Sequence, residues 1–305
     1  MFPGQGAQFV GMARDLIEQD PDAAALLAAA ESRIQLPLRR LMLEGPEELL
    51  QRTEHAQPAI VFHSLALLAR LTAAGCRPDA VAGHSLGEFA ALDAAGGLEA
   101  LPAIEAVAAR GRAMAAASSP GSGMAAVLGL PDEVVEQILA GQAGHDLVVA
   151  ANFNAPGQVV ISGTDAGIRA VTPALERAGA KRILRLSVSA AFHSPLMEQA
   201  ASAFRQAWAG IPLVRLTVPQ VFNADAQVHK EAAEVRDLLV RQLTGPVRWT
   251  ACVRRLWGLG VRTFVEIGPK RTLTPLVKKI EPAASTYNVE DLHSLDAFVE
   301  MARAS

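Results

Sequence analysis

The pentapeptide at residues 83–87, Gly-His-Ser-Leu-Gly, has the residue types and the spacing of a nucleophilic serine. An apolar run ends just before it, and a helical pattern follows it as far as Gly96-Gly97. In a strand-to-helix turn of this kind, a nucleophile elbow, the glycines permit the tight bend and the serine hydroxyl is held above the sheet. The N–H groups at the start of the helix favour negative charge on the group that the serine attacks. The motif predicts acyl transfer through Ser85, although a surface serine in a glycine-rich turn would have the same local sequence.

A serine nucleophile needs a base, and the sequence favours His193. It follows a β-like run and precedes a helical segment, which places it where open α/β sheets build their active sites. His84 adjoins Ser85, but neighbours on an extended strand point to opposite faces. A packed or surface role is the ordinary one for any single histidine, and it is the need of Ser85 for a partner that favours His193. The other histidines are His55, His63, His145, His229 and His293.

A third catalytic residue is not evident, because no carboxylate stands in an elbow-like context between Ser85 and a later histidine. We therefore expect a Ser–His dyad whose imidazole is oriented by a backbone carbonyl or an amide side chain. The N–H of Leu86, directly after the serine, is the usual first oxyanion donor. The glycine-flanked turn at residues 4–8 can bring the N–H of Gln5 as a second donor. It lacks the lysine of a P-loop and the three glycines of a dinucleotide site.

Arg110 lies among alanines in a predicted helix over residues 99–117. An arginine in this setting either extends from the helix flank into solvent or is buried against an anion. The sequence leaves these two alternatives equal.

Composition limits the remaining possibilities. The chain has 305 residues, 50% of them hydrophobic, which suffices for one large domain with an insertion or for two domains. Its net charge is -3, and no basic stretch offers an electrostatic footprint for nucleic acid. Cys76 and Cys252 form neither a disulfide framework nor a metal motif, and a reducing compartment is the simplest fit. No signal peptide or membrane-spanning run is evident, so we expect a soluble, cytoplasmic protein.

Short β-like runs alternate with helical periodicity throughout the chain, which predicts an α/β fold with a largely parallel sheet. The cluster Ser118-Ser119-Pro120-Gly121-Ser122-Gly123 is the strongest boundary signal. After it, the order β-α-β-β-α-β predicts a ferredoxin-like subdomain over residues 122–189, inserted into a larger domain of residues 1–121 and 190–305. Its strands are expected at 124–130, 147–151, 158–162 and 181–188, and its helices at 131–141 and 165–179. In the larger domain we expect strands at 80–83, 216–223 and 263–267, and helices at 22–33, 58–74, 88–95, 99–117, 192–208, 231–242, 247–259, 272–280 and 292–303.

Seven motifs, in order across nearly the whole chain, resemble the malonyl-CoA:acyl carrier protein transacylases, which include the fatty-acid enzyme and the acyltransferases of polyketide synthases. The motifs are FPGQGAQ at residues 2–8, GHSLGE at 83–88, Arg110-Gly111 with Met114, NFNAPGQVVISG at 152–163, AFHS at 191–194, RQL with PVRW at 241–249, and EIGP at 266–269. Each motif alone is weak evidence for this family, but seven motifs in the same order and spacing are specific for it. The resemblance implies an α/β-hydrolase-like large domain around the inserted subdomain.

The resemblance also implies a role for each candidate. Ser85 would become malonyl-serine, and His193 would activate first Ser85 and then the phosphopantetheine thiol of the carrier. The backbone carbonyl of Gln242 would hold the His193 ring, and the N–H groups of Gln5 and Leu86 would form the oxyanion hole.

The specificity residues follow from the same resemblance. Arg110 would pair with the free carboxylate of the malonyl group, because the planar guanidinium matches a carboxylate in a bidentate fork. An acetyl group would leave Arg110 unpaired, at a cost of about a few kcal/mol in a dry site. Phe192 and Leu86 resemble the malonyl-selective pattern, in which a bulky ring crowds an α-methyl branch. Ala190 departs from the histidine that malonyl-selective synthase domains often carry.

The expected reaction is a ping-pong transfer from malonyl-CoA to a phosphopantetheinylated acyl carrier protein, with no bound cofactor and no metal. The carrier would be a transient partner, and nucleic acid and membrane would not be partners. A monomer is compatible with the sequence, which does not fix the oligomeric state. The tail after Ile280 favours a free-standing enzyme, and residues 190–193 lean toward polyketide assembly in trans. An acyl-thioester hydrolase and a non-catalytic docking module are the alternatives. Basic residues at the mouth of the site would contact the acidic carrier, or are ordinary surface charges: Arg182, Arg185, Lys270 and Lys278.

Overall fold

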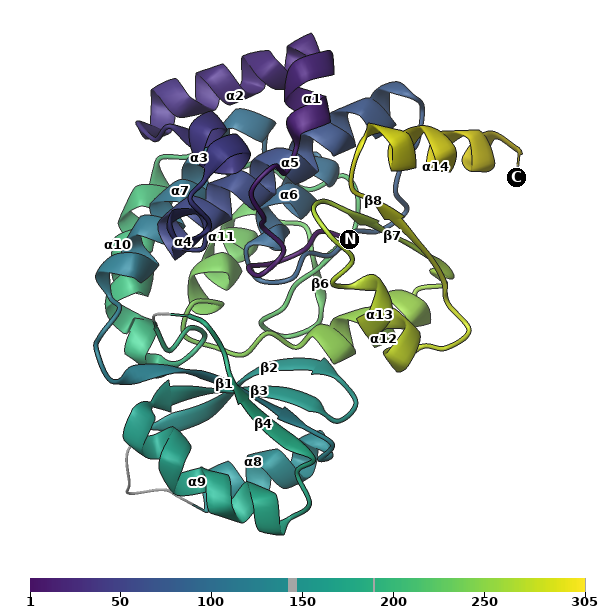
Figure 1. The fold of residues 1–305 in the computed structure, drawn as a ribbon. Coiled ribbons are helices and arrows are strands. Elements are labelled where there is room, and N and C mark those ends of the chain that lie inside the picture. The colour runs from purple at the N-terminus through teal and green to yellow at the C-terminus, as the bar shows by residue number, and fades with distance from the viewer. Residues whose placement is uncertain (142–146, 189, 305) are drawn as a thin grey trace.

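The computed structural model describes residues 1–141, 147–188 and 190–304 (Figure 1). Its strands are β1 (Ser122–Leu128), β2 (Val148–Ala155), β3 (Gln158–Thr164), β4 (Arg182–Arg185), β5 (Gln220–Val221), β6 (Val228–His229), β7 (Thr263–Ile267) and β8 (Ser285–Val289). Its helices are α1 (Arg14–Gln19), α2 (Pro21–Ile34), α3 (Leu38–Glu44), α4 (Glu47–Leu50), α5 (Thr53–Ala73), α6 (Gly87–Ala94), α7 (Ala100–Ala116), α8 (Asp132–Ala140), α9 (Asp165–Arg177), α10 (Glu198–Ala209), α11 (Ala232–Arg241), α12 (Trp249–Gly258), α13 (Thr274–Ile280) and α14 (Leu292–Ala304). A 3₁₀ turn, η1 (Pro195–Met197), precedes α10.

Short parallel segments form the central sheet of the larger layer. β8 pairs with β7 in parallel. Main-chain hydrogen bonds link residues 1–2 to β7 on one side and to residues 82 and 84 on the other. Val81 in turn bridges Gln220 of β5 in parallel. The chain therefore has a mixed α/β fold, in which these central segments pair in parallel as predicted while β6 pairs with β5 in antiparallel orientation.

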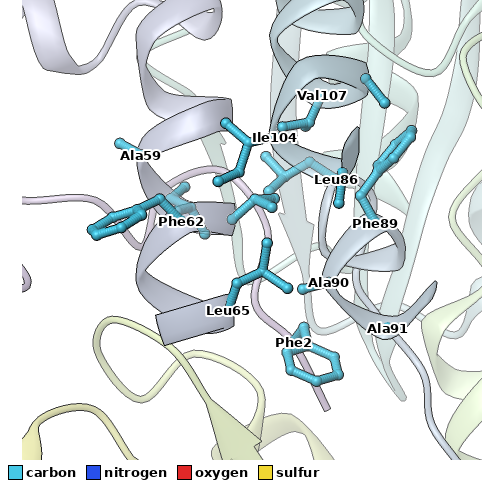
Figure 2. Close-up of a cluster of buried hydrophobic side chains, with 14 of the residues drawn as sticks. Phe2, Ala59, Phe62, Leu65, Leu86, Phe89, Ala90, Ala91, Ile104 and Val107 are labelled. Carbon is cyan, nitrogen blue, oxygen red and sulfur yellow. The ribbon is translucent and has the colours of Figure 1, made fainter. Parts of the chain in front are cut away.

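The two faces of this sheet bury different sets of helices, because successive side chains of an extended segment point to opposite sides. Phe2 and Val81 join the core formed with α5, α6, α7 and α10. Met1 and Ala82 join a second core formed with α12 and α13. Figure 2 shows part of the first core, in which Leu86 lies among side chains of α5 and α7. The residue that follows Ser85 is thus anchored in the interior.

A smaller layer follows α7 and has its own core. Its strands lie in the order β2-β3-β1-β4, with each neighbouring pair antiparallel, and α8 and α9 cover the face turned away from the larger layer (Figure 1). The elements alternate as β1, α8, β2, β3, α9, β4, as the sequence predicts. Its β2 edge is tied to the larger layer at Val247, which exchanges hydrogen bonds with residues 151 and 153. The expected boundary at residue 189 lies outside the described residues.

Several element bounds differ from the predictions. The helix expected to begin at Pro58 begins at Thr53, because packing of residues 56 and 57 in the core outweighs the usual preference of proline for the first turn. The helix expected over 192–208 is α10, which begins only at Glu198, after the 3₁₀ turn η1 that Ser194 caps. The expected strand at 216–223 is reduced to β5, and that at 80–83 to single bridges. The elements α1, α3, α4, β6 and β8 were not predicted.

Among the described helices, none combines the length and the apolarity needed to cross a lipid bilayer.

Candidate active site

Ser85 occupies a sharp turn between the central sheet and α6. Its φ is 52°, in the left-handed region that a non-glycine residue rarely adopts. A Cβ on Gly83 would lie 2.0 Å from the carbonyl carbon of Gly87, and one on Gly87 would lie 2.3 Å from the main-chain oxygen of Phe2. Both glycines are therefore required for α6 to begin directly above the sheet, and this close approach positions the serine.

Asn223 holds this turn from the neighbouring strand. The N–H of Ser85 donates to Asn223 Oδ1 at 2.7 Å, and Asn223 Nδ2 donates to the oxygen of Gly83 at 2.8 Å. The sequence analysis missed this residue. The available signal was its place at the end of the expected strand 216–223, at the same carboxyl edge of the sheet as the Ser85 turn.

Ser85 and His193 lie in direct contact. Ser85 Oγ is 2.8 Å from His193 Nε2, and His193 Nδ1 is 2.8 Å from the main-chain oxygen of Gln242. Because a carbonyl oxygen only accepts, Nδ1 carries the proton and Nε2 is free to accept from the serine hydroxyl. Gln242 ends α11, where main-chain oxygens are unpaired and the helix dipole favours positive charge. The C-terminus of a helix thus takes the place of the carboxylate in a triad.

His193 is buried, with φ 57°. Burial, assisted by the positive charge of Arg110, lowers its pKa from 6.5 to about 3. The ring is therefore neutral at pH 7, as a proton acceptor must be. His84, the histidine discounted by the sequence, has its Nε2 2.9 Å from Asn154 Oδ1 and packs against Trp249.

Arg110 is buried rather than extended into solvent, with 1% of its surface exposed. Its Nη1 donates to Gln57 Oε1 at 2.8 Å, and its Nη2 donates to Gln242 Oε1 at 2.8 Å and to Ser85 Oγ at 3.1 Å. Burial lowers its pKa to about 10, partly opposed by Glu88, so the guanidinium stays charged at pH 7. A buried cation held beside the serine is able to pair with an anion.

The candidates Gln5, Leu86, Ser85, Arg110, Phe192 and His193 all line one cavity of about 410 Å³. Within the described residues, the N–H groups of Gln5 and Leu86 have no acceptor in the protein. Two unpaired backbone donors beside the serine suit an oxyanion. The structure thus brings every predicted site residue together, with Gln242 directly behind the cavity wall.

The polar residues behind Arg110 were not predicted. Gln57 Nε2 donates to Thr53 Oγ1 at 2.8 Å, and Thr53 Oγ1 donates to Gln5 Oε1 at 2.8 Å. This chain links the guanidinium to the loop that carries the second unpaired N–H. The expected helix start at residue 58 left both residues outside the element that positions them.

Of the basic residues considered for carrier binding, Lys270 lines the cavity. Its Nζ donates to the main-chain oxygen of Gln8 at 3.0 Å. Arg185 pairs with Asp165, Lys278 donates to a main-chain oxygen, and Arg182 is exposed on β4. Lys270 is therefore the one of these four that the structure places at the site.

Comparison with known proteins identifies the class. Residues 1–295 match the family model described as "Acyl transferase domain". The chain is 40% identical over 303 residues to the malonyl CoA-acyl carrier protein transacylase of Bacillus subtilis, covering 98% of this chain and 95% of that relative.

Solved structures agree. A malonyl-CoA:acyl carrier protein transacylase of Xanthomonas oryzae pv. oryzae superposes with a TM-score of 0.94 at 39% identity, covering 98% of this chain and 96% of that one. A malonyl-transacylase in complex with a type II polyketide synthase acyl carrier protein gives a TM-score of 0.94 at 38% identity, with 98% of each chain covered. The chain belongs to the acyl transferase domain family and, within it, to the malonyl CoA-acyl carrier protein transacylases.

Proposed function

We propose that this protein transfers a malonyl group from malonyl-CoA to the phosphopantetheine thiol of an acyl carrier protein, through malonyl-Ser85. The observation that carries the proposal is the contact of one serine oxygen with both a neutral imidazole and a buried guanidinium. The names of the relatives support the choice of acyl group and acceptor.

In the first half-reaction, Ser85 Oγ attacks the thioester carbonyl carbon while His193 Nε2 takes the hydroxyl proton. The N–H groups of Gln5 and Leu86 receive the negative charge that develops on the carbonyl oxygen. The carbon–sulfur bond then breaks, and the imidazolium returns the proton to the leaving CoA thiolate. In the second half-reaction, the carrier thiol gives its proton to His193 and attacks malonyl-Ser85, and Ser85 recovers the proton as it leaves.

Arg110 favours malonyl in two ways. A malonyl carboxylate pairs with the guanidinium and takes over the hydrogen bond that Ser85 Oγ now receives. The same carboxylate cancels the positive charge that holds the pKa of His193 low, so the imidazolium forms more readily during attack. An acetyl group supplies neither effect.

The architecture of this proposal is an α/β-hydrolase-like large domain, residues 1–121 and 190–305, with a ferredoxin-like subdomain at 122–189. The strand order β2-β3-β1-β4 supports the second label, and a separate apolar core supports the division. The cavity lies where the two meet, because Met124 and Asn152 line it from the smaller layer. Phe192, in the wall, would crowd a methyl branch next to the malonyl carbonyl.

The proposed chemistry uses side chains and main-chain groups alone, without a resident cofactor or metal. We also propose that the enzyme acts in a reducing, cytoplasmic compartment, which is consistent with the free thiols of Cys76 and Cys252.

Intact-mass spectrometry after incubation with malonyl-, methylmalonyl- and acetyl-CoA tests the proposal. We expect the malonyl adduct on Ser85 to dominate and Ser85→Ala to abolish it. Addition of a fatty-acid or a type II polyketide carrier should then discharge the adduct to the carrier thiol. Discharge to water faster than to both carriers would instead establish a hydrolase, and turnover by Ser85→Ala would reject covalent catalysis.

A further inference from the structure

Glu88 is a fully buried acidic side chain with no part in the reaction described above. It is the second residue of α6, three positions after the nucleophile. Its Oε1 accepts from the N–H of Asn223 at 2.6 Å, and its Oε2 accepts from Nε2 of Gln242. Because each oxygen of this buried carboxyl group accepts a hydrogen bond, the orientation of the side chain is defined. The two donor residues indicate which parts of the site Glu88 positions.

The two partners of Glu88 support different functional groups. Asn223 holds the turn of Ser85 through its side-chain oxygen. Gln242 holds His193 through its main-chain oxygen and Arg110 through its side-chain oxygen, at 2.8 Å in each case. Glu88 therefore contacts the two residues that position the nucleophile, the base and the guanidinium.

The side-chain amide of Gln242 can work in only one orientation. Arg110 has donors alone, so the amide oxygen must face it, and the amide NH₂ group must face the opposite way. On that side it donates to Glu88 Oε2 and, at 3.1 Å, to the main-chain oxygen of Ser85. An amide flipped about this axis would turn N–H groups toward the guanidinium. Glu88 Oε2 shares this NH₂ group with the main-chain oxygen of Ser85 and, at 3.4 Å, with Asn223 Oδ1, and a donor at position 88 would oppose the working orientation of the amide.

We propose that Glu88 is a positioning residue for malonyl selectivity, which fixes the amide of Gln242 so that Arg110 and His193 are held together over Ser85. The inference rests on the proposed function and adds a residue that acts through another. A glutamine at position 88 has the same shape, but its acceptor would be needed by Asn223 and its NH₂ group would then face the NH₂ group of Gln242. Either amide must turn, and the guanidinium loses its fixed place.

The test measures Ser85 acylation of the full chain by malonyl-CoA and by acetyl-CoA, using rapid quench and intact mass. We expect Glu88→Gln to lower the malonyl rate about 30-fold and the malonyl-to-acetyl ratio about tenfold. Gln242→Met, which removes the amide but keeps the main-chain oxygen, should lower the ratio to a similar extent. Because Glu88 acts on Arg110 through Gln242, the double variant Glu88→Gln/Gln242→Met should have a ratio no lower than Gln242→Met alone.

Glu266→Gln is the matched control. Glu266 is equally buried and accepts from the main-chain N–H groups of residues 272, 273 and 274, where it organises the start of α13. Its variant should lower the melting temperature and leave the malonyl-to-acetyl ratio unchanged, since a smaller folded fraction lowers both rates equally.

An unchanged ratio in Glu88→Gln, or effects that multiply in the double variant, would overturn the inference. If Glu88→Gln does not fold, an unchanged ratio in Gln242→Met does the same. A wild-type protein that malonyl-CoA fails to acylate would refute the proposed function instead, so the two failures are distinguishable.

Discussion

The region around the Ser85 turn and the smaller layer of β1–β4 differ in backbone conformation and in the polarity of their buried side chains. The smaller layer is a four-stranded antiparallel sheet around an apolar core, with Asn152 and Ser162 as its buried polar residues and an irregular register between β2 and β3. The region around the Ser85 turn places two non-glycine residues, Ser85 and His193, at positive φ and buries Arg110 and Glu88 around them. Such features lower stability and persist only where surrounding contacts fix them. The difference separates residues that fold this protein from residues that make it reactive.

The largest effect should come from Arg110→Ala. We expect malonyl acylation to fall about 10³-fold, while acetyl acylation falls far less or rises, because the variant loses the carboxylate partner and the charge that opposes imidazolium formation. Acylation rates with both CoA esters, measured by CoA release, check this. Arg205→Ala, which removes only an exposed pair with Asp237, is the control and should change neither rate. Malonyl acylation that survives Arg110→Ala, with acetyl transfer still negligible, would remove the carboxylate clamp from the mechanism.

The second prediction concerns the regular region. Ile161 of β3 is fully buried in the core of the smaller layer. Ile161→Ala should lower the free energy of unfolding by about 3 kcal/mol, on the order of a 100-fold change in the folding equilibrium, by opening a cavity. Urea titration measures this loss. In the folded fraction the malonyl-to-acetyl ratio should equal that of the wild type, and a changed ratio would mean that the two regions are energetically coupled.

The same contrast explains how much the sequence predicted. The strands and helices of the smaller layer were found because β-like runs and helical periodicity succeed one another clearly there, although β2 extends to residue 155 rather than 151. The central sheet was predicted only in outline, since its segments at residues 1–2, 81–83 and 220–221 are too short to show a period.

For the site, local signals indicated Ser85, and the resemblance supplied Gln242 and the role of Arg110. Glu88 was noted only as part of a motif. Its contacts lie 135 residues away at Asn223 and 154 residues away at Gln242, and no local pattern encodes such a distance. Long-range polar contacts are what sequence patterns leave out, and here they hold the reactive groups.

A smaller effect is expected from Thr53→Val, which interrupts the hydrogen-bonded chain from Arg110 to Gln5. Valine has nearly the shape of threonine but leaves Gln57 Nε2 and Gln5 Oε1 without their partner. We expect malonyl acylation to fall about fivefold, and the melting temperature to fall as well because buried polar groups lose their partner. Thr250→Val is the control: this buried hydroxyl donates to the main-chain oxygen of Phe153 where the two layers meet. It should affect stability alone, and an equal loss of rate in both variants would deny Thr53 a specific role.

The smallest effect tests how the charge of Arg110 acts on the pKa of His193. The pKa of His193 is lowered to about 3 by burial and then by Arg110, with His84 adding to the effect. Acetyl-CoA acylation of the wild type should therefore not lose rate through His193 as the pH falls from 8 to 5. Arg110→Met removes the positive charge but not the burial, so the pKa of His193 rises while staying below 6.5. The fall in acylation rate at acid pH, which follows protonation of His193, then occurs at higher pH. We expect the pH profile to shift by about half a pH unit, or the rate at a fixed acid pH to change about threefold.

Rates at several pH values, with folding monitored by circular dichroism, measure the shift. A pH profile that stays in place or moves to lower pH would show that Arg110 does not act on the imidazole by charge, and would leave carboxylate pairing as its whole contribution.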